Sequence, residues 1–258
     1  MADLNLDPSV LESYIEGFYG HGSYGAKYWF VGMEFGGGDT AREVVSRIQG
    51  WYDRGRKELE DLGPNGVGAG SRWFLPRYPL QPTWAKLIRV VLTAEGGSPT
   101  TEDLRAYQKA ELGRAGGRDC ILELLPLPSP GLNHWRFYPE YAREYPSLRY
   151  LGGRATYTSH VAPIRIAHLR KRISEYRPRA VVFYGMGYAH WWRRIAGLDF
   201  TPSSIDKVCV ARGEDTLYVI MQHPIARGLP STYFDAVGRL VAGVSSVSTQ
   251  ALESEVHT

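Results

Sequence analysis

Cysteine is scarce in this sequence, which has only Cys120 and Cys209 among 258 residues. Two thiols cannot supply a four-cysteine iron–sulfur cluster or zinc site, so both kinds of metal centre are excluded. Each cysteine lies inside an apolar run, and we expect both to be small buried core residues in a reducing compartment. We expect no metal and no other cofactor.

Long apolar runs are also missing. No run approaches the roughly 18 to 20 residues that a membrane-spanning helix needs, and no basic-then-apolar leader is present. We therefore expect a soluble, cytoplasmic protein that does not enter a membrane. A large excess of charge of one sign is lacking too, because the net charge is only +3. That value permits a nucleic-acid partner without arguing for one.

Internal repeats are absent as well. The chain has 258 residues, 43% of them hydrophobic, and can bury one sizeable core. We expect a single domain over residues 1–244 that acts as a monomer, followed by a flexible tail over residues 245–258.

Apolar runs rich in β-branched and aromatic residues alternate with segments of helical periodicity. The predicted strands are 28–33, 119–127, 179–187, 207–212 and 217–224, and the predicted helices are 8–18, 39–52, 83–94, 101–112, 163–176, 188–196 and 231–244. Residues 54–80 and 129–160 are predicted to be loops. The alternation predicts an α/β fold, a three-layer αβα sandwich with a central, mostly parallel sheet of four or five strands. Sites in such sheets form at the carboxyl ends of the strands.

Three predicted strand ends carry unusual residues: GMEFGGG at 32–38, ELLPLP at 123–128 and QHPIARGLP at 222–230. In this order they resemble the uracil-DNA glycosylase superfamily. Its members carry a short glycine-containing motif after the first strand, a base-reading Asn on a middle strand and a His-Pro motif after the last strand. The resemblance covers roughly residues 28–242 and is to a divergent member that has no iron–sulfur cluster.

The resemblance implies that Glu34 and His223 are catalytic, although the family has Asp, Asn or Ala where this chain has Glu34. Hydrolysis of a glycosidic bond passes through an oxocarbenium-like sugar, which a carboxylate can stabilise while it orients water. A histidine can hydrogen-bond the base as it leaves. The alternatives are a helix-capping or solvated Glu34 and a structural His223.

The resemblance also implies a base-recognition set of Glu123, Phe35, Gly36 and Phe74. Glu123 stands where the family has its Asn. An ionised carboxylate only accepts hydrogen bonds, so it suits a base edge that donates, such as the N4 amino group of cytosine. Gly36 stands where uracil enzymes place an aromatic that blocks the pyrimidine 5-position, so this chain leaves room for a 5-substituent. Phe74 belongs to an aromatic loop that stacks on the base or, alternatively, forms a core under the loop.

Contacts to DNA are expected from five residues. Arg227 lies where family members place the side chain that wedges into the duplex, and Leu229 is the alternative wedge. The backbone amide of Gly37 is a candidate for holding a phosphate. Arg170 and Arg172, in a basic helical segment, either contact phosphates or form a solvated helix face.

These expectations describe a monofunctional DNA glycosylase that flips a 5-modified cytosine out of DNA and leaves an abasic site. Glucosylated hydroxymethylcytosine of phage DNA fits this description, which makes antiviral defence a hypothesis. Three alternatives stay open: a uracil or mismatch-type glycosylase, a catalytically silent nucleic-acid-binding module on the same fold, and a hydrolase of free nucleosides or nucleotides.

Overall fold

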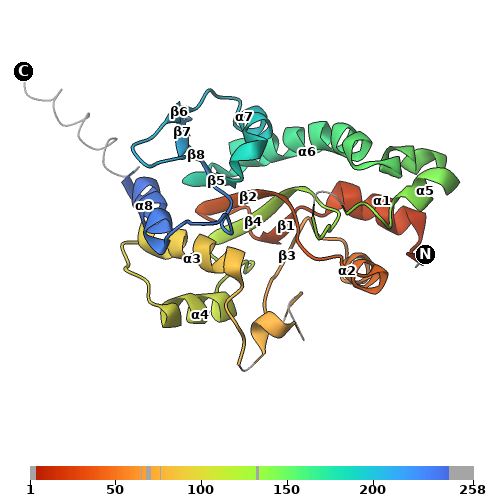
Figure 1. The fold of residues 1–258 in the computed structure, drawn as a ribbon, viewed down its shortest axis with the longest axis horizontal. Helices are drawn as coiled ribbons and strands as arrows, with labels where there is room; N and C mark the ends of the chain where they lie inside the picture. The colour runs from red at the N-terminus through yellow and green to blue at the C-terminus, as the bar shows by residue number, and fades with distance from the viewer. Residues whose placement is uncertain (1–3, 65, 68–70, 76, 132–133, 244–258) are drawn as a thin grey trace, which may run out of the picture.

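A computed structural model describes residues 4–243 except 65, 68–70, 76 and 132–133, and the predicted tail 245–258 lies outside the described residues (Figure 1). The strands are β1 (Gly20–Gly22), β2 (Tyr28–Glu34), β3 (Leu59–Glu60), β4 (Asp119–Leu125), β5 (Ala180–Tyr184), β6 (Thr201–Pro202), β7 (Cys209–Arg212) and β8 (Leu217–Met221). The α-helices are α1 (Pro8–Gly17), α2 (Ala41–Asp53), α3 (Pro82–Ala94), α4 (Thr101–Ala110), α5 (Pro139–Glu144), α6 (Arg154–Tyr176), α7 (Ala189–Ala196) and α8 (Ser231–Ala242). Short 3-10 helices are η1 (Arg72–Phe74), η2 (Pro146–Gly152) and η3 (Met186–Tyr188).

All described strands belong to one mixed sheet in the order β3-β1-β4-β2-β5-β8-β7-β6. Its centre is parallel, because β4, β2, β5 and β8 are consecutive neighbours that run in one direction. On the outer sides, β1 is antiparallel to β4, and β7 is antiparallel to both β8 and β6. The predicted α/β class is therefore confirmed, but the predicted sheet of four or five mostly parallel strands is wrong. The unpredicted strands β1, β3 and β6 have two or three residues each, too few to show an apolar pattern.

Both faces of the central strands are buried, as their continuous apolar runs predict. In β2 the side chains alternate, with Trp29 and Val31 in one core and Tyr28 and Phe30 in the other. Helices α1, α2, α6 and α7 contribute to the first core, and α3, α4 and α8 contribute to the second. Figure 1 shows these two sets of helices on opposite faces of the sheet.

Helix α6 begins much earlier than predicted. The sequence places a helix start at Pro163, since proline favours the first helical turn, but the helix begins at Arg154 and continues through Pro163. A proline inside a helix removes one backbone hydrogen bond and is tolerated here within a long helix. The early start has a consequence for function, because it carries Arg154 to the carboxyl edge of the sheet.

Capping residues support several other helix starts. Thr40 accepts a hydrogen bond from the backbone of Glu43 at the start of α2, and Thr100 and Asp103 form a reciprocal capping box at α4. No helix among the described residues is long and apolar enough to cross a membrane.

Candidate site at the carboxyl edge of the parallel strands

The parallel centre of the sheet gathers polar residues at one edge. Because β4, β2, β5 and β8 are parallel neighbours, their carboxyl ends meet there, and they bring together Glu123, Glu34, Tyr184 and His223. Neighbouring strands lie about 4.8 Å apart, so β2 and β8 are separated by about 10 Å. We call these four residues, together with Arg154, the carboxyl-edge cluster.

A hydrogen bond joins two members of this cluster across an intervening strand. The Tyr184 hydroxyl donates to Glu123 Oε1 at 2.7 Å, and both residues are only 4% exposed. Tyr184 lies on β5 and Glu123 on β4, with β2 between them. Gly32 of β2, opposite Glu123 in the register, makes the bond possible. A Cβ added to Gly32 would lie 2.2 Å from Tyr184 Oη and 2.3 Å from Glu123 Oε2.

The protonation state of Glu123 follows from its surroundings. Burial is the main cause that raises its pKa to about 8; the hydrogen bond from Tyr184 and the charge of Arg165 act in the opposite direction, while the nearby Glu34 carboxylate adds to the rise. The carboxyl group is therefore mainly neutral at pH 7. Its second oxygen, Oε2, is buried and has no hydrogen-bond partner among the described residues. The expectation of a purely accepting carboxylate does not hold for such a group.

Glu34, at the end of β2, forms an ion pair with Arg154 at the start of α6. The two side chains are 12% and 17% exposed. Arg154 also donates to Ser129 Oγ at 3.3 Å and lies over the Trp135 ring. Burial raises the pKa of Glu34, and the guanidinium of Arg154 offsets part of that rise. Glu34 is thus a largely buried, paired carboxylate, and the alternative of a helix cap is wrong because Thr40 caps α2.

His223 follows β8 and faces Tyr184 edge-on, with the ring centroids 5.5 Å apart. Burial lowers the pKa of His223, so the imidazole is neutral at pH 7. The backbone N–H of Ile225 donates to His223 Nδ1 at 3.4 Å. This contact favours the tautomer with its proton on Nε2, which leaves Nε2–H as a hydrogen-bond donor.

The structure places the two predicted phenylalanines in the cores. Phe74 is 7% exposed and packs against Trp84 in the second core, so the core alternative describes it. Phe35 is half-buried between Phe18 and His21, with ring centroids 5.4 and 5.5 Å away. Phe74 is therefore enclosed in the core, whereas Phe35 remains partly exposed.

The glycines after Glu34 differ from one another. Gly36 is exposed, and a Cβ added there would meet no atom within 4 Å, so the space beside it is open. Gly37 has a φ of 94°, in the left-handed region that favours glycine. Its added Cβ would lie 2.4 Å from Glu43 Oε1, so this glycine lets the loop close over the start of α2.

The basic segment of α6 lies far from the cluster. Arg170 is sixteen residues beyond Arg154, which is about 24 Å along the helix at about 1.5 Å per residue. Arg170 donates to the backbone of Arg194, while Arg172 forms ion pairs with Glu58 and Glu175. These arginines therefore do not contribute to the carboxyl-edge cluster, and their contact with phosphates elsewhere stays a prediction.

The loop after β8 carries both predicted wedge residues. Arg227 is exposed and has no partner among the described residues, whereas Leu229 is half-buried against the second core. Sequence reasoning missed Ile225 on the same loop, which is 60% exposed. It also missed Tyr184, which lies within the predicted strand 179–187 and is the last residue of β5.

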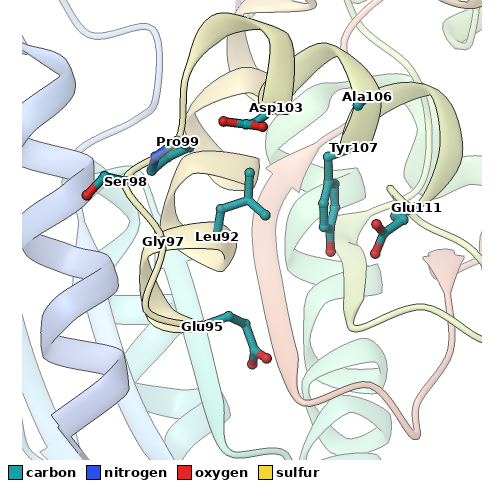
Figure 2. Close-up of a pocket in the computed structure, with 9 residues that line it drawn as sticks. All are labelled: Leu92, Glu95, Gly97, Ser98, Pro99, Asp103, Ala106, Tyr107 and Glu111. Atoms are coloured by element: carbon teal, nitrogen blue, oxygen red, sulfur yellow. The ribbon is translucent and has the colours of Figure 1, made fainter.

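A cavity of about 420 Å³ lies at the opposite, amino-terminal edge of the sheet, between α3 and α4 (Figure 2). Glu95 lines this cavity and accepts a hydrogen bond at 2.5 Å from the hydroxyl of Tyr28, the first residue of β2. This bond places the cavity at the amino-terminal end of the strand. Lys27 and Arg118 form ion pairs with the same carboxylate. The cavity is separate from the carboxyl-edge cluster.

Comparison of the chain with protein-family models and with curated proteins gave no match. Any functional conclusion therefore depends on the strand-end motifs and on the geometry of the cluster.

Proposed function

We propose that this protein is a monofunctional DNA glycosylase that hydrolyses the N-glycosidic bond of a base flipped out of DNA. The observation that carries the proposal is the placement of Glu34, His223 and the Glu123–Tyr184 pair on adjacent parallel strands at one edge. A carboxylate, a neutral imidazole and a buried polar pair at the carboxyl ends of neighbouring strands fit this reaction.

Glu34 acts on water and on the sugar. Its carboxylate stabilises the oxocarbenium-like C1′ and takes a proton from the attacking water, so that a C1′–O bond forms as the C1′–N bond breaks. A raised pKa makes Glu34 a better base, and the ion pair with Arg154 favours its ionised form. The base leaves with the bonding electron pair, and His223 donates a hydrogen bond to its developing negative charge.

The rim of the cluster supports a polyanionic substrate. Three exposed arginines lie on or beside the loops that leave β2, β4 and β8: Arg42, Arg136 and Arg227. None of them has a carboxylate partner among the described residues. Helices α2, α7 and α8 follow the parallel strands β2, β5 and β8, so their amino ends, which carry partial positive charge, point to the same edge. Phosphates of DNA complement such a rim.

The substrate we infer is a cytosine with a group at its 5-position. The open space beside Gly36 accommodates that group. A neutral Glu123 carries one donor and one acceptor, and the Watson–Crick edge of cytosine places the ring N3 acceptor beside the N4 amino donor. Glucosylated hydroxymethylcytosine of phage DNA is the bulkiest such base we consider, and its excision would serve antiviral defence.

A base-release assay tests the proposal. Duplex oligonucleotides carrying uracil, hydroxymethylcytosine or glucosylated hydroxymethylcytosine are incubated with the protein, and alkali then cleaves any abasic site. We expect cleavage at a modified cytosine and little at uracil. If the protein binds these duplexes and every base stays attached, it is a silent nucleic-acid-binding module and the proposed activity is wrong.

Closing the space beside Gly36 is expected to change substrate choice. In Gly36→Tyr the new ring occupies the region that we assign to the 5-substituent. We expect release of glucosylated hydroxymethylcytosine to fall at least tenfold more than release of hydroxymethylcytosine, because the larger group clashes more. Gly36→Ala is the control and should retain the preference of the parent protein. Equal losses on both bases would place the 5-substituent elsewhere.

A further inference from the structure

The second carboxyl oxygen of Glu123 is a buried polar atom without a partner. Oε1 accepts the hydrogen bond from Tyr184, whereas Oε2 has no partner among the described residues, and the side chain is 96% buried. An unpaired buried polar atom is unfavourable, because it has lost its hydrogen bonds to water. Oε2 lies over Gly32, where an added Cβ would be 2.3 Å from it, and Glu34 is two residues further along β2.

The charged groups around Glu123 oppose one another, because the Glu34 carboxylate raises the pKa of Glu123 and the Arg165 guanidinium lowers it. Arg165 of α6 is the nearest buried cation, but its guanidinium donates to backbone carbonyls of Ile15, Phe18, Glu123 and Leu124 at 2.6–3.1 Å. It binds the main chain of Glu123, and no hydrogen bond or ion pair joins it to the Glu123 carboxyl group among the described residues.

The other strand ends add no free positive charge. Glu34 of β2 is a carboxylate, and it already holds Arg154 in its own ion pair. Tyr184 of β5 contributes a neutral hydroxyl, and His223 after β8 is a neutral imidazole. Glu123 is therefore surrounded by neutral groups, one negative charge and one cation, and that cation hydrogen-bonds to backbone carbonyls and not to the Glu123 carboxyl group.

We propose that Glu123 Oε2 carries a proton and donates a hydrogen bond to an acceptor atom on the flipped base, while Tyr184 is the positioning residue that fixes Oε1 as the accepting oxygen. That the ligand is a base rests on the proposed function. Glu123 then presents a donor, Oε2–H, beside an acceptor, Oε1, to the ligand. For cytosine the accepting atom is the ring N3, and the N4 amino group donates to Oε1, which has a second lone pair.

If this assignment is correct, the protein distinguishes bases by whether the ring atom at position 3 can accept a hydrogen bond. A base whose ring nitrogen is replaced by carbon cannot accept from Oε2–H and leaves that donor unpaired. Discrimination against such an analogue is strong, because a buried polar group without a partner weakens binding more than a lost exposed contact does.

A binding titration tests the inference. The probe is duplex DNA with a 2′-fluorinated 5-hydroxymethylcytidine, whose glycosidic bond resists hydrolysis, and fluorescence anisotropy reports affinity. With the pKa of Glu123 at about 8, we expect the affinity of the parent protein to fall about tenfold between pH 7 and pH 9. Glu123→Gln, whose amide donates at every pH, is expected to show no such fall. Tyr184→Phe is expected to move the midpoint to higher pH, because the lost hydrogen bond stabilises the carboxylate.

Infrared difference spectra provide a readout that needs no DNA. The spectrum of the parent protein minus that of Glu123→Gln should contain a protonated carboxyl band at pH 7 that disappears near pH 8. A carboxylate band at pH 7 overturns the inference. The inference is also overturned if the affinity of Glu123→Gln falls between pH 7 and pH 9 as much as that of the parent protein. A second probe has carbon in place of the ring N3 of the same base (3-deaza). If it binds as tightly as the first probe, the inference is also overturned. Failure of all probes to bind at every pH, with the protonated band present, overturns the proposed function instead.

Discussion

Replacing Glu34 by glutamine is expected to slow base release by about 10²- to 10⁴-fold, the range that a positioned general base contributes. The amide keeps the size of the side chain but can neither take a proton from water nor stabilise the cationic sugar by its charge. The measurement is a single-turnover rate on the best substrate of the base-release assay. Binding of uncleavable duplex DNA is expected to persist, because the rim arginines are unchanged.

The control for this variant comes from the other end of the same helix. Glu58 pairs with Arg172 of α6, just as Glu34 pairs with Arg154, and Glu58 lies far from the strand ends. Glu58→Gln also removes a glutamate that is paired with an arginine of α6, although Arg172 keeps its second partner, Glu175. We expect Glu58→Gln to retain nearly full activity. A fully active Glu34→Gln, or similar losses in both variants, would contradict a catalytic role for Glu34.

The central strands could be predicted from the sequence because burial on both faces leaves a strong pattern. β4 is a run of seven buried residues, and β2, β5 and β8 each contain a run of five. The outer strands leave no such pattern. β1 is Gly-His-Gly, and its place beside β4 depends on tertiary contacts that no local periodicity records.

The site could be predicted in part for the same reason. Once strands are parallel, residues at their carboxyl ends lie at one edge, and this places Glu34, Glu123 and His223 together. The hydrogen bond from Tyr184 could not be predicted, because it depends on the order of the strands and on the absence of a side chain at Gly32. Arg154 was missed because Pro163 resembles a helix start.

The character of a side chain was harder to predict than its place. Glu123 was expected to be an acceptor, since an isolated glutamate is ionised at pH 7. Its neutral state depends on burial and on a second carboxylate nearby, neither of which is visible in the run ILELL. Phe74 shows the same limit, because the sequence does not distinguish an aromatic loop residue that faces solvent from one that is buried in the core.

Replacing Gly32 by alanine is expected to destabilise the fold by about 2–3 kcal/mol, within the range for overpacking a core. Strand propensity alone would favour alanine by about 0.5–1 kcal/mol, because glycine loses more conformational freedom on folding. The steric term outweighs that gain, since the new Cβ would lie 2.2 Å from Tyr184 Oη and 2.3 Å from Glu123 Oε2. Both atoms belong to fully enclosed side chains that have little room to move.

Gly36→Ala is the matched control, four residues further along the same segment. Its added Cβ meets no atom within 4 Å, so its free energy of unfolding should stay within about 0.5 kcal/mol of the parent value. Urea titrations of the three proteins measure these differences, provided their m-values agree. The surviving fraction of folded Gly32→Ala should also lose base release, because the added methyl group separates Tyr184 from Glu123. Equal stability of the two variants would mean that Tyr184 and Glu123 do not meet over Gly32, and the assignment of Glu123 as a base-reading acid would lose its structural basis.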